Sequence, residues 1–98
     1  MTIEDIVNGI QAKADGADPI GNSLKLGIGE KIVHIDGTGE KNIVTSEDKE
    51  ADCVVSISEE NFKDLVKGDL NPMMAFMSGK IKIKGDMGVA MKLQSLLG

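Results

Sequence analysis

Several residue types are missing from this sequence, and each absence excludes a class of protein. There is no Trp, no Tyr and only two Phe, so an apolar interior must consist of aliphatic and thioether side chains. All eleven basic residues are Lys. Without a guanidinium group for bidentate contacts, specific recognition of nucleic acid is disfavoured. The longest apolar run is residues 73–77, too short to span a bilayer, and no secretory signal opens the chain. We therefore expect neither a transmembrane nor a secreted protein.

Cysteine and histidine are each present once, which leaves little for catalysis or metal binding. A lone Cys53 cannot close an internal disulfide, so the sequence predicts a reducing, cytoplasmic location. His34 and Cys53 fall in different predicted strands with side chains on opposite faces, and no zinc-ligand spacing occurs. We expect no catalytic residue, no metal site, no cofactor and no enzymatic activity.

Length and composition predict one globular domain over residues 1–98. The chain is 41% hydrophobic and 28% charged, which is ordinary for a folded domain. Its formal net charge is −5, but residues 1–60 carry 13 acidic side chains against 5 Lys, whereas residues 61–98 carry 3 against 6. The basic half of the chain could therefore face an anionic partner while the acidic half turns away.

Hydrophobic periodicity predicts the order helix, four strands, two helices, strand, helix. The expected helices are residues 3–14, 59–67, 72–78 and 87–97, and the expected strands are residues 23–28, 31–36, 42–45, 53–58 and 80–84. Short turns make the first three strands antiparallel neighbours, while about twenty residues between the last two allow a crossover. One apolar face per strand indicates an α+β fold in which helices cover one face of a five-stranded sheet.

Alternation within the strands indicates which side chains point inward. In the second strand, either Ile32 and His34 or Val33 and Ile35 could face the core, and we favour the second pair. In the fourth strand, the inward set is Cys53, Val55 and Ile57. The segment 80–84 alternates Lys with Ile, which predicts Ile toward the core and a row of Lys toward solvent.

The last predicted helix has more apolar surface than one sheet contact requires. Two stripes run along it, one formed by Met87, Ala90, Met91, Gln94 and Leu97 and the other by Val89, Leu93 and Leu96. The helix could pack against both the sheet and another helix, or one stripe could face a cavity or a partner. The Met-rich segment 73–77 has the same excess. Two such helices beside a strand predict a pocket whose walls can repack.

The segment 68–93, GDLNPMMAFMSGKIKIKGDMGVAMKL, resembles the signature of the sterol carrier protein 2 lipid-transfer family. The preceding residues ADCVVSISEENFKDLVKG resemble the strand and helix that lead into that signature. The likeness is strong over residues 51–98 and consists of element order alone over residues 1–50. It implies a five-stranded, mainly antiparallel sheet with helices on one face and an apolar tunnel between them. The resemblance also implies that the tunnel holds a fatty acid, an acyl-coenzyme A, a sterol or a phospholipid.

Site residues follow from the resemblance and from the strand faces. Carried over by position, the tunnel walls would include Leu65, Met73, Phe76, Met77, Ile83, Met87 and Met91. The alternation adds four candidates on the sheet, namely Val33, Ile35, Val55 and Ile57. The family's eukaryotic members end in a peroxisomal signal, which is absent here, in keeping with a cytoplasmic protein.

Two functions remain open at this point. The first is a lipid-binding or lipid-transfer protein without catalysis, with Lys80, Lys82 and Lys84 contacting anionic head groups, coenzyme A phosphates or a membrane surface. The plainer interpretation of these Lys is a solvated strand face. The alternative function is a scaffold of the same fold that binds protein partners in a lipid or quinone pathway.

Overall fold

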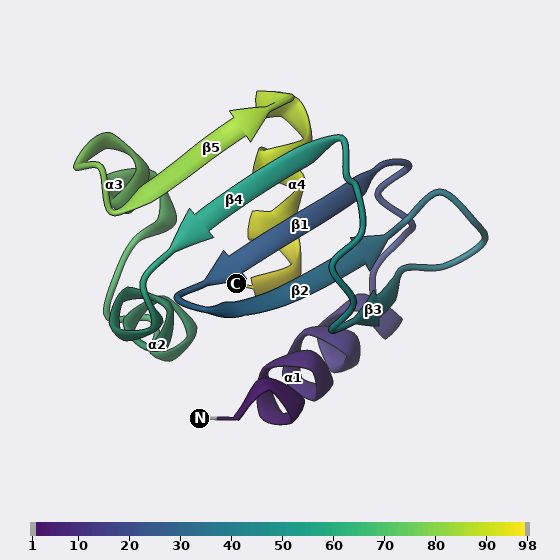
Figure 1. Ribbon diagram of the computed structural model, residues 1–98, viewed down its shortest axis with the longest axis horizontal. Coiled ribbons are helices and arrows are strands. Elements are labelled where there is room, and N and C mark those ends of the chain that lie inside the picture. The colour runs from purple at the N-terminus through teal and green to yellow at the C-terminus, as the bar shows by residue number, and fades with distance from the viewer. Residues whose placement is uncertain (1, 98) are drawn as a thin grey trace.

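The computed structural model describes residues 2–97, with the side chains of Pro72 and residues 94–97 outside the description. The elements follow one another in the predicted order (Figure 1). Their bounds are α1 Ile3–Asp15, β1 Ser23–Ile28, β2 Lys31–Asp36, β3 Ile43–Thr45, β4 Cys53–Ile57, α2 Glu59–Lys67, α3 Pro72–Met77, β5 Ile81–Gly85 and α4 Met87–Leu97. The boundaries predicted from periodicity and capping residues are therefore correct to within one residue at most ends.

The five strands form one mixed, mainly antiparallel sheet in the order β3-β2-β1-β4-β5. The β1–β2, β2–β3 and β4–β5 pairs are antiparallel, and β1–β4 is parallel. The crossover that the spacing allows between the last two strands does not occur, because β4 and β5 are antiparallel neighbours. Ile57, which ends β4, pairs with Ile81, which begins β5. The chain through α2 and α3 thus returns to the end of the sheet that it left, and β5 runs back along β4.

The apolar face of the sheet is the one predicted from alternation. Leu26 of β1 pairs with Val33 of β2 and Val55 of β4, and all three side chains are buried. The choice of Val33 and Ile35 as the inward pair of β2 is confirmed. Two helices share this face, α1 over β2 and β3 and α4 over β1, β4 and β5. Figure 1 shows α4 behind the sheet, with the opposite face toward the viewer.

The opposite face of the sheet is open except near His34. Residues 46–52 pass over it, and the Nε2 atom of His34 lies 3.1 Å from the carbonyl oxygen of Glu50. His34 pairs with Lys25, whereas Cys53 pairs with Leu24, so the two side chains lie on opposite faces as predicted. His34 is buried and structural in this setting.

A glycine at the end of β5 lets the chain turn sharply into α4. Gly85 has a φ of 108°, in the region that favours glycine, and a Cβ there would lie 2.6 Å from the carbonyl oxygen of Asp52. Asp86 follows, and its Oδ1 atom accepts a hydrogen bond of 2.8 Å from the amide of Gly88 in the first turn of α4. This turn brings α4 under the apolar face of the sheet.

Candidate functional site

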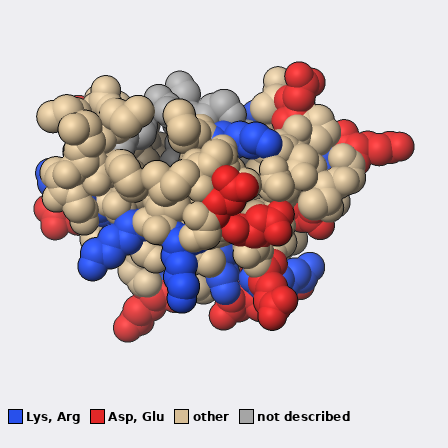
Figure 2. Space-filling model, turned by 90° about the horizontal axis from the view of Figure 1, so that it is seen from above, with Lys and Arg blue, Asp and Glu red and all other residues tan. Residues whose placement is uncertain are grey.

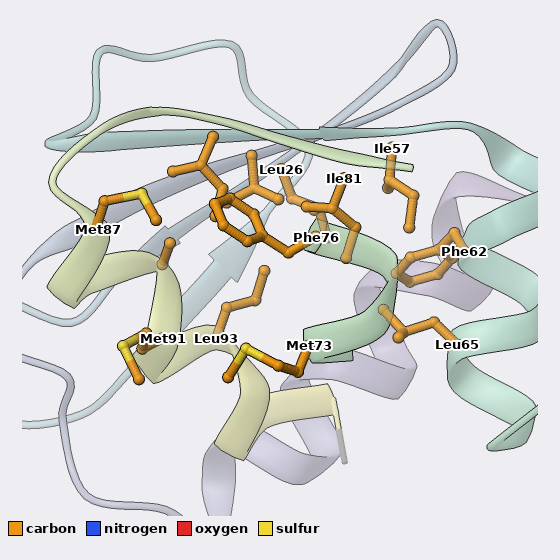
Figure 3. A pocket seen from close by; sticks show the side chains of 13 residues that line it. Leu26, Ile57, Phe62, Leu65, Met73, Phe76, Ile81, Met87, Met91 and Leu93 are labelled. Carbon is orange, nitrogen blue, oxygen red and sulfur yellow. The ribbon is translucent and has the colours of Figure 1, made fainter. Parts of the chain in front are cut away.

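An apolar cavity of about 140 Å³ lies between the sheet and the helices α2, α3 and α4. Its wall combines residues from six elements, and every described lining residue is apolar (Figure 3). In Figure 3, Leu26, Ile57 and Ile81 project from the sheet, and Met73, Met91 and Leu93 come from the helices. The described lining residues are Leu26, Val55, Ile57, Phe62, Leu65, Met73, Phe76, Ile81, Ile83, Met87, Ala90, Met91 and Leu93.

Helix α3 forms one wall because its first turn is held by Asn71. The Oδ1 atom of Asn71 accepts hydrogen bonds from the amides of Met73 (2.9 Å) and Met74 (3.3 Å). Pro72 follows this cap at the start of the helix, where the missing amide hydrogen costs nothing. The helix is only six residues long and contacts β5. Such a short element depends on its packing and can shift at low cost.

The cavity opens to the surface between α3 and α4. Three of its methionines are about half exposed or more, with 51% for Met73, 46% for Met87 and 63% for Met91. Phe76, at 37%, lies beside them, whereas Phe62 and Leu65 at the inner end are buried. Flexible thioether side chains thus line the mouth, and buried apolar side chains line the inner end.

Eight of the eleven predicted apolar site residues meet around this cavity: Val55, Ile57, Leu65, Met73, Phe76, Ile83, Met87 and Met91. The other three do not line it. Val33 and Ile35 are fully buried on β2, where α1 covers the sheet instead of α3 and α4. Met77 ends α3 with 75% of its surface exposed. The prediction for Val33 and Ile35 used the inward face of the strand, which does not show which helix covers that face. The prediction for Met77 came from the resemblance.

The cavity also contains five residues that were not predicted as site residues, namely Leu26, Phe62, Ile81, Ala90 and Leu93. The strand alternation already indicated two of them. Ile81 has the same phase as Ile83, and Leu26 has the phase of the inward residues of β1. Leu93 was assigned to the other stripe of the last helix. Both stripes of α4 thus reach the cavity. The side chains of Gln94, Leu96 and Leu97 lie outside the described residues.

The predicted Lys row lies on the opposite side of the sheet from the cavity. Lys82 pairs with Ser56 and Lys84 with Val54, the residues of β4 that face away from α4. In Figure 2 this open face forms the lower side of the molecule, from which Lys side chains project, while the upper left is largely uncharged. The Lys row therefore does not surround the cavity mouth.

Groups capable of chemistry are absent from the described cavity wall. Cys53 is buried nearby on β4, and burial raises the pKa of its thiol, with the carboxylate of Asp86 adding to the effect. A thiol with a raised pKa is a poor nucleophile at neutral pH. Among residues 2–97, no three His, Cys, Asp or Glu side chains gather where they could hold a metal ion.

No helix in the described part of the chain has both the length and the apolar character needed to cross a bilayer.

Comparison with known proteins places this geometry in a family. The model of the SCP-2 sterol transfer family matches residues 7–98. The chain is 45% identical to sterol carrier protein 2 of Homo sapiens over 58 residues, which is 59% of this chain and 11% of that protein. It therefore spans only about a ninth of the length of that relative.

Two solved structures have the same fold. The sterol carrier protein domain 2 of Helicoverpa armigera is 31% identical, with a TM-score of 0.65 over 96% of this chain and 77% of that one. Palmitated SCP2L2 of Aedes aegypti is 24% identical, with a TM-score of 0.77 over 99% of this chain and 95% of that one. The family match covers nearly the whole sequence, and the cavity lies in the part where the sequence motif is strongest. The chain belongs to the SCP-2 sterol transfer family.

Proposed function

We propose that this chain binds the acyl chain of a fatty acid, or of a related lipid, in the cavity between the sheet and α3 and α4. The observation that carries this proposal is the wall itself, which is entirely apolar in its described part and opens through exposed methionines. Monomeric proteins rarely leave such side chains exposed together without a binding role. The described lining residues include no acid, base or nucleophile, and we propose a carrier that holds its ligand unchanged.

The size of the cavity indicates how a long chain is accommodated. A cavity of about 150 Å³ holds one benzene molecule, and this one measures about 140 Å³. A sixteen-carbon chain therefore exceeds the space present. Full burial of that chain would gain about 12 kcal/mol at ~0.8 kcal/mol per CH₂, before ordering costs are subtracted. That gain is sufficient to displace the side chains of Met73, Met87 and Met91 and to shift α3.

Among the possible lipids, a flexible acyl chain fits better than a flat sterol. The only described aromatic rings at the cavity are those of Phe62 and Phe76, so few surfaces are available for stacking on fused rings. A methionine wall adapts to a chain that can bend. The palmitated Aedes aegypti protein, which shares this fold, supports the choice of palmitate as the first ligand to test.

The experiment compares two methionines on the same surface. Met91 lines the mouth, whereas Met77 is exposed and lies outside the lining. Met91→Glu should weaken the displacement of a fluorescent fatty acid by palmitate at least about tenfold, because a carboxylate at the mouth must lose water when the acyl chain enters. Met77→Glu carries the same charge and should bind as the unaltered protein does. Equal affinity of the two variants, both folded by circular dichroism, would refute the cavity assignment.

The alternative function, a scaffold that binds protein partners, predicts that the purified protein contains no bound lipid. Native mass spectrometry of gently purified protein should show a bound lipid if the chain is a carrier. An empty monomer or a tight dimer, with no fatty-acid displacement at any concentration tested, would favour the scaffold and reject the carrier.

A further inference from the structure

A second hollow, of about 420 Å³, lies on the open face of the sheet. Gly27 of β1 lines it, together with Lys25, Lys80 and Lys82. Lys82 and Ser56 have the opposite phase from Ile81 and project from the other face of the sheet than the apolar cavity. Ile57, at the end of β4, lines both spaces, and the other described lining residues of the two differ.

The shape of the hollow follows from the residues that pair with one another across β5, β4, β1 and β2. Lys82, Ser56, Gly27 and Ile32 form one row across the sheet. Gly27 has no side chain, and a Cβ built on it would meet nothing closer than 3.8 Å. The floor of the hollow is thus backbone, with a hydroxyl on one side and an aliphatic side chain on the other.

The charge around the hollow is positive, although the whole chain has a formal net charge of −5. Among its described lining residues there are three Lys and no carboxylate. Lys25 is paired with Asp48 at 2.8 Å, and this pair is partly exposed. Lys80 and Lys82 have no carboxylate within ion-pair distance in the described part of the chain. Two ammonium groups are therefore available to an anion, and a third is shared with Asp48.

We propose that this hollow binds a phosphate monoester, with Lys80 and Lys82 contacting the phosphate and Ser56 donating a hydrogen bond to it. Lysine binds phosphate as a point charge, and several ammonium groups favour a dianion over a carboxylate. The space beyond the phosphate, over Gly27 and beside Ile32, accepts a small organic group. Such a phosphate belongs either to a soluble metabolite or to a phospholipid head group at a membrane surface.

The test uses ¹H–¹⁵N NMR titration with glycerol 3-phosphate, which has no acyl chain and so does not report on the apolar cavity. We expect saturable shifts at the amides of Gly27, Ser56 and Gly79 that weaken as salt is added. Lys82→Gln should lower the affinity about fivefold, a typical value for one partly exposed charge contact. The matched control is Lys84→Gln, which removes the same charge from the same face of β5 outside the hollow and should change the affinity less than about twofold.

A second variant tests the space instead of the charge. Gly27→Val places a strand-favouring side chain where the hollow now lies, and it should abolish binding while the thermal midpoint is kept. Vesicles of phosphatidic acid, compared with vesicles of phosphatidylcholine, identify the source of the phosphate. If the protein binds phosphatidic acid vesicles but not glycerol 3-phosphate, and the variants weaken this binding in the same order, the phosphate is that of a lipid head group. The proposal is overturned if neither glycerol 3-phosphate nor phosphatidic acid vesicles bind saturably, or if Lys82→Gln and Lys84→Gln lose affinity equally, because both results indicate diffuse attraction to surface charge.

Discussion

At the scale of single residues, the side chain of Asn42 holds the loop between α1 and β1 in place. Its side chain is buried, accepts a hydrogen bond from the amide of Ile20 (2.9 Å) and donates one to the carbonyl oxygen of Asp18 (3.0 Å). Gly37 packs against it so closely that a Cβ there would lie 2.6 Å from Oδ1 of Asn42. The side-chain amide of Asn42 thus provides hydrogen-bond partners for two backbone groups of the loop between α1 and β1.

Asn42→Ala should lower the free energy of unfolding by about 2 kcal/mol, because it leaves the buried amide of Ile20 without a partner and removes the partly buried hydrogen bond to the Asp18 carbonyl. Urea denaturation followed by circular dichroism measures the change. Asn8→Ala, on the exposed side of α1, is the control and should alter stability by less than about 0.5 kcal/mol. Comparable losses for both variants would contradict the role assigned to the Asn42 side chain.

Cys53 provides a second prediction at this scale, because it is the only thiol in the chain. Its side chain is fully buried, and burial raises its pKa. Reaction with a thiol reagent at neutral pH should therefore be slow in the native protein and fast in denaturant. Native labelling as fast as that of the unfolded chain would mean that α4 does not stay packed over β4.

At the scale of elements, an ion pair joins the start of β2 to the start of α2. The Nζ atom of Lys31 lies 2.9 Å from Oε2 of Glu59. The hydrogen bond and charge of Lys31 lower the pKa of Glu59 below its ordinary value of 4.5. Because the carboxyl pKa is lower in the folded state, the pair stabilises the fold above the unfolded pKa, and this contribution is lost as the pH falls through the folded pKa.

Glu59→Gln should therefore reduce stability at pH 7, and the difference from the unaltered protein should vanish as the pH falls through the lowered pKa of Glu59 in the folded state. Chemical denaturation at a series of pH values measures this convergence. Glu60→Gln removes a carboxylate from the same helical turn, and no ion pair to Glu60 is present among the described residues. A difference that grows toward acid pH would show that the sign is wrong.

At the scale of the whole molecule, the proposed lipid would bind between the same sheet and helices whose packing stabilises the fold. A ligand that binds only the folded state raises stability by mass action, by about 2.7 kcal/mol at a hundredfold excess over Kd. The cavity lies between α4, the sheet and α3, so its filling couples the C-terminal third of the chain to the rest. Thermal unfolding should therefore report on binding directly.

Ala90→Leu should weaken this coupling. Ala90 lines the cavity and is buried on α4, so the added carbons occupy space that is now empty. We expect the thermal midpoint without lipid to stay the same or rise, and the increase caused by palmitate to shrink. The control is Ala12→Leu on the exposed side of α1. A full palmitate effect in folded Ala90→Leu would place the ligand elsewhere.

Much of the site could be predicted from the alternation and the sequence motif. The phase of Ile81 and Ile83, and of Val55 and Ile57, identified the correct sheet face, and the Met-rich helices identified the wall. Val33 and Ile35 lie outside the lining because a period of two gives the face of a strand and not the helix that covers it. Met77, which the resemblance placed in the wall, also lies outside the lining, because its position in the motif does not show which side of the six-residue α3 faces the cavity.

The sequence by itself determined the element order, the inward faces of β2, β4 and β5 and the family, because these depend on local period, capping residues and a contiguous motif. Only the tertiary structure decided that β4 lies parallel to β1, that α1 and α4 divide one face, and that the Lys row lies behind the cavity. Strand order and helix placement depend on contacts between residues far apart in the chain. Such contacts leave no periodic trace in either partner alone.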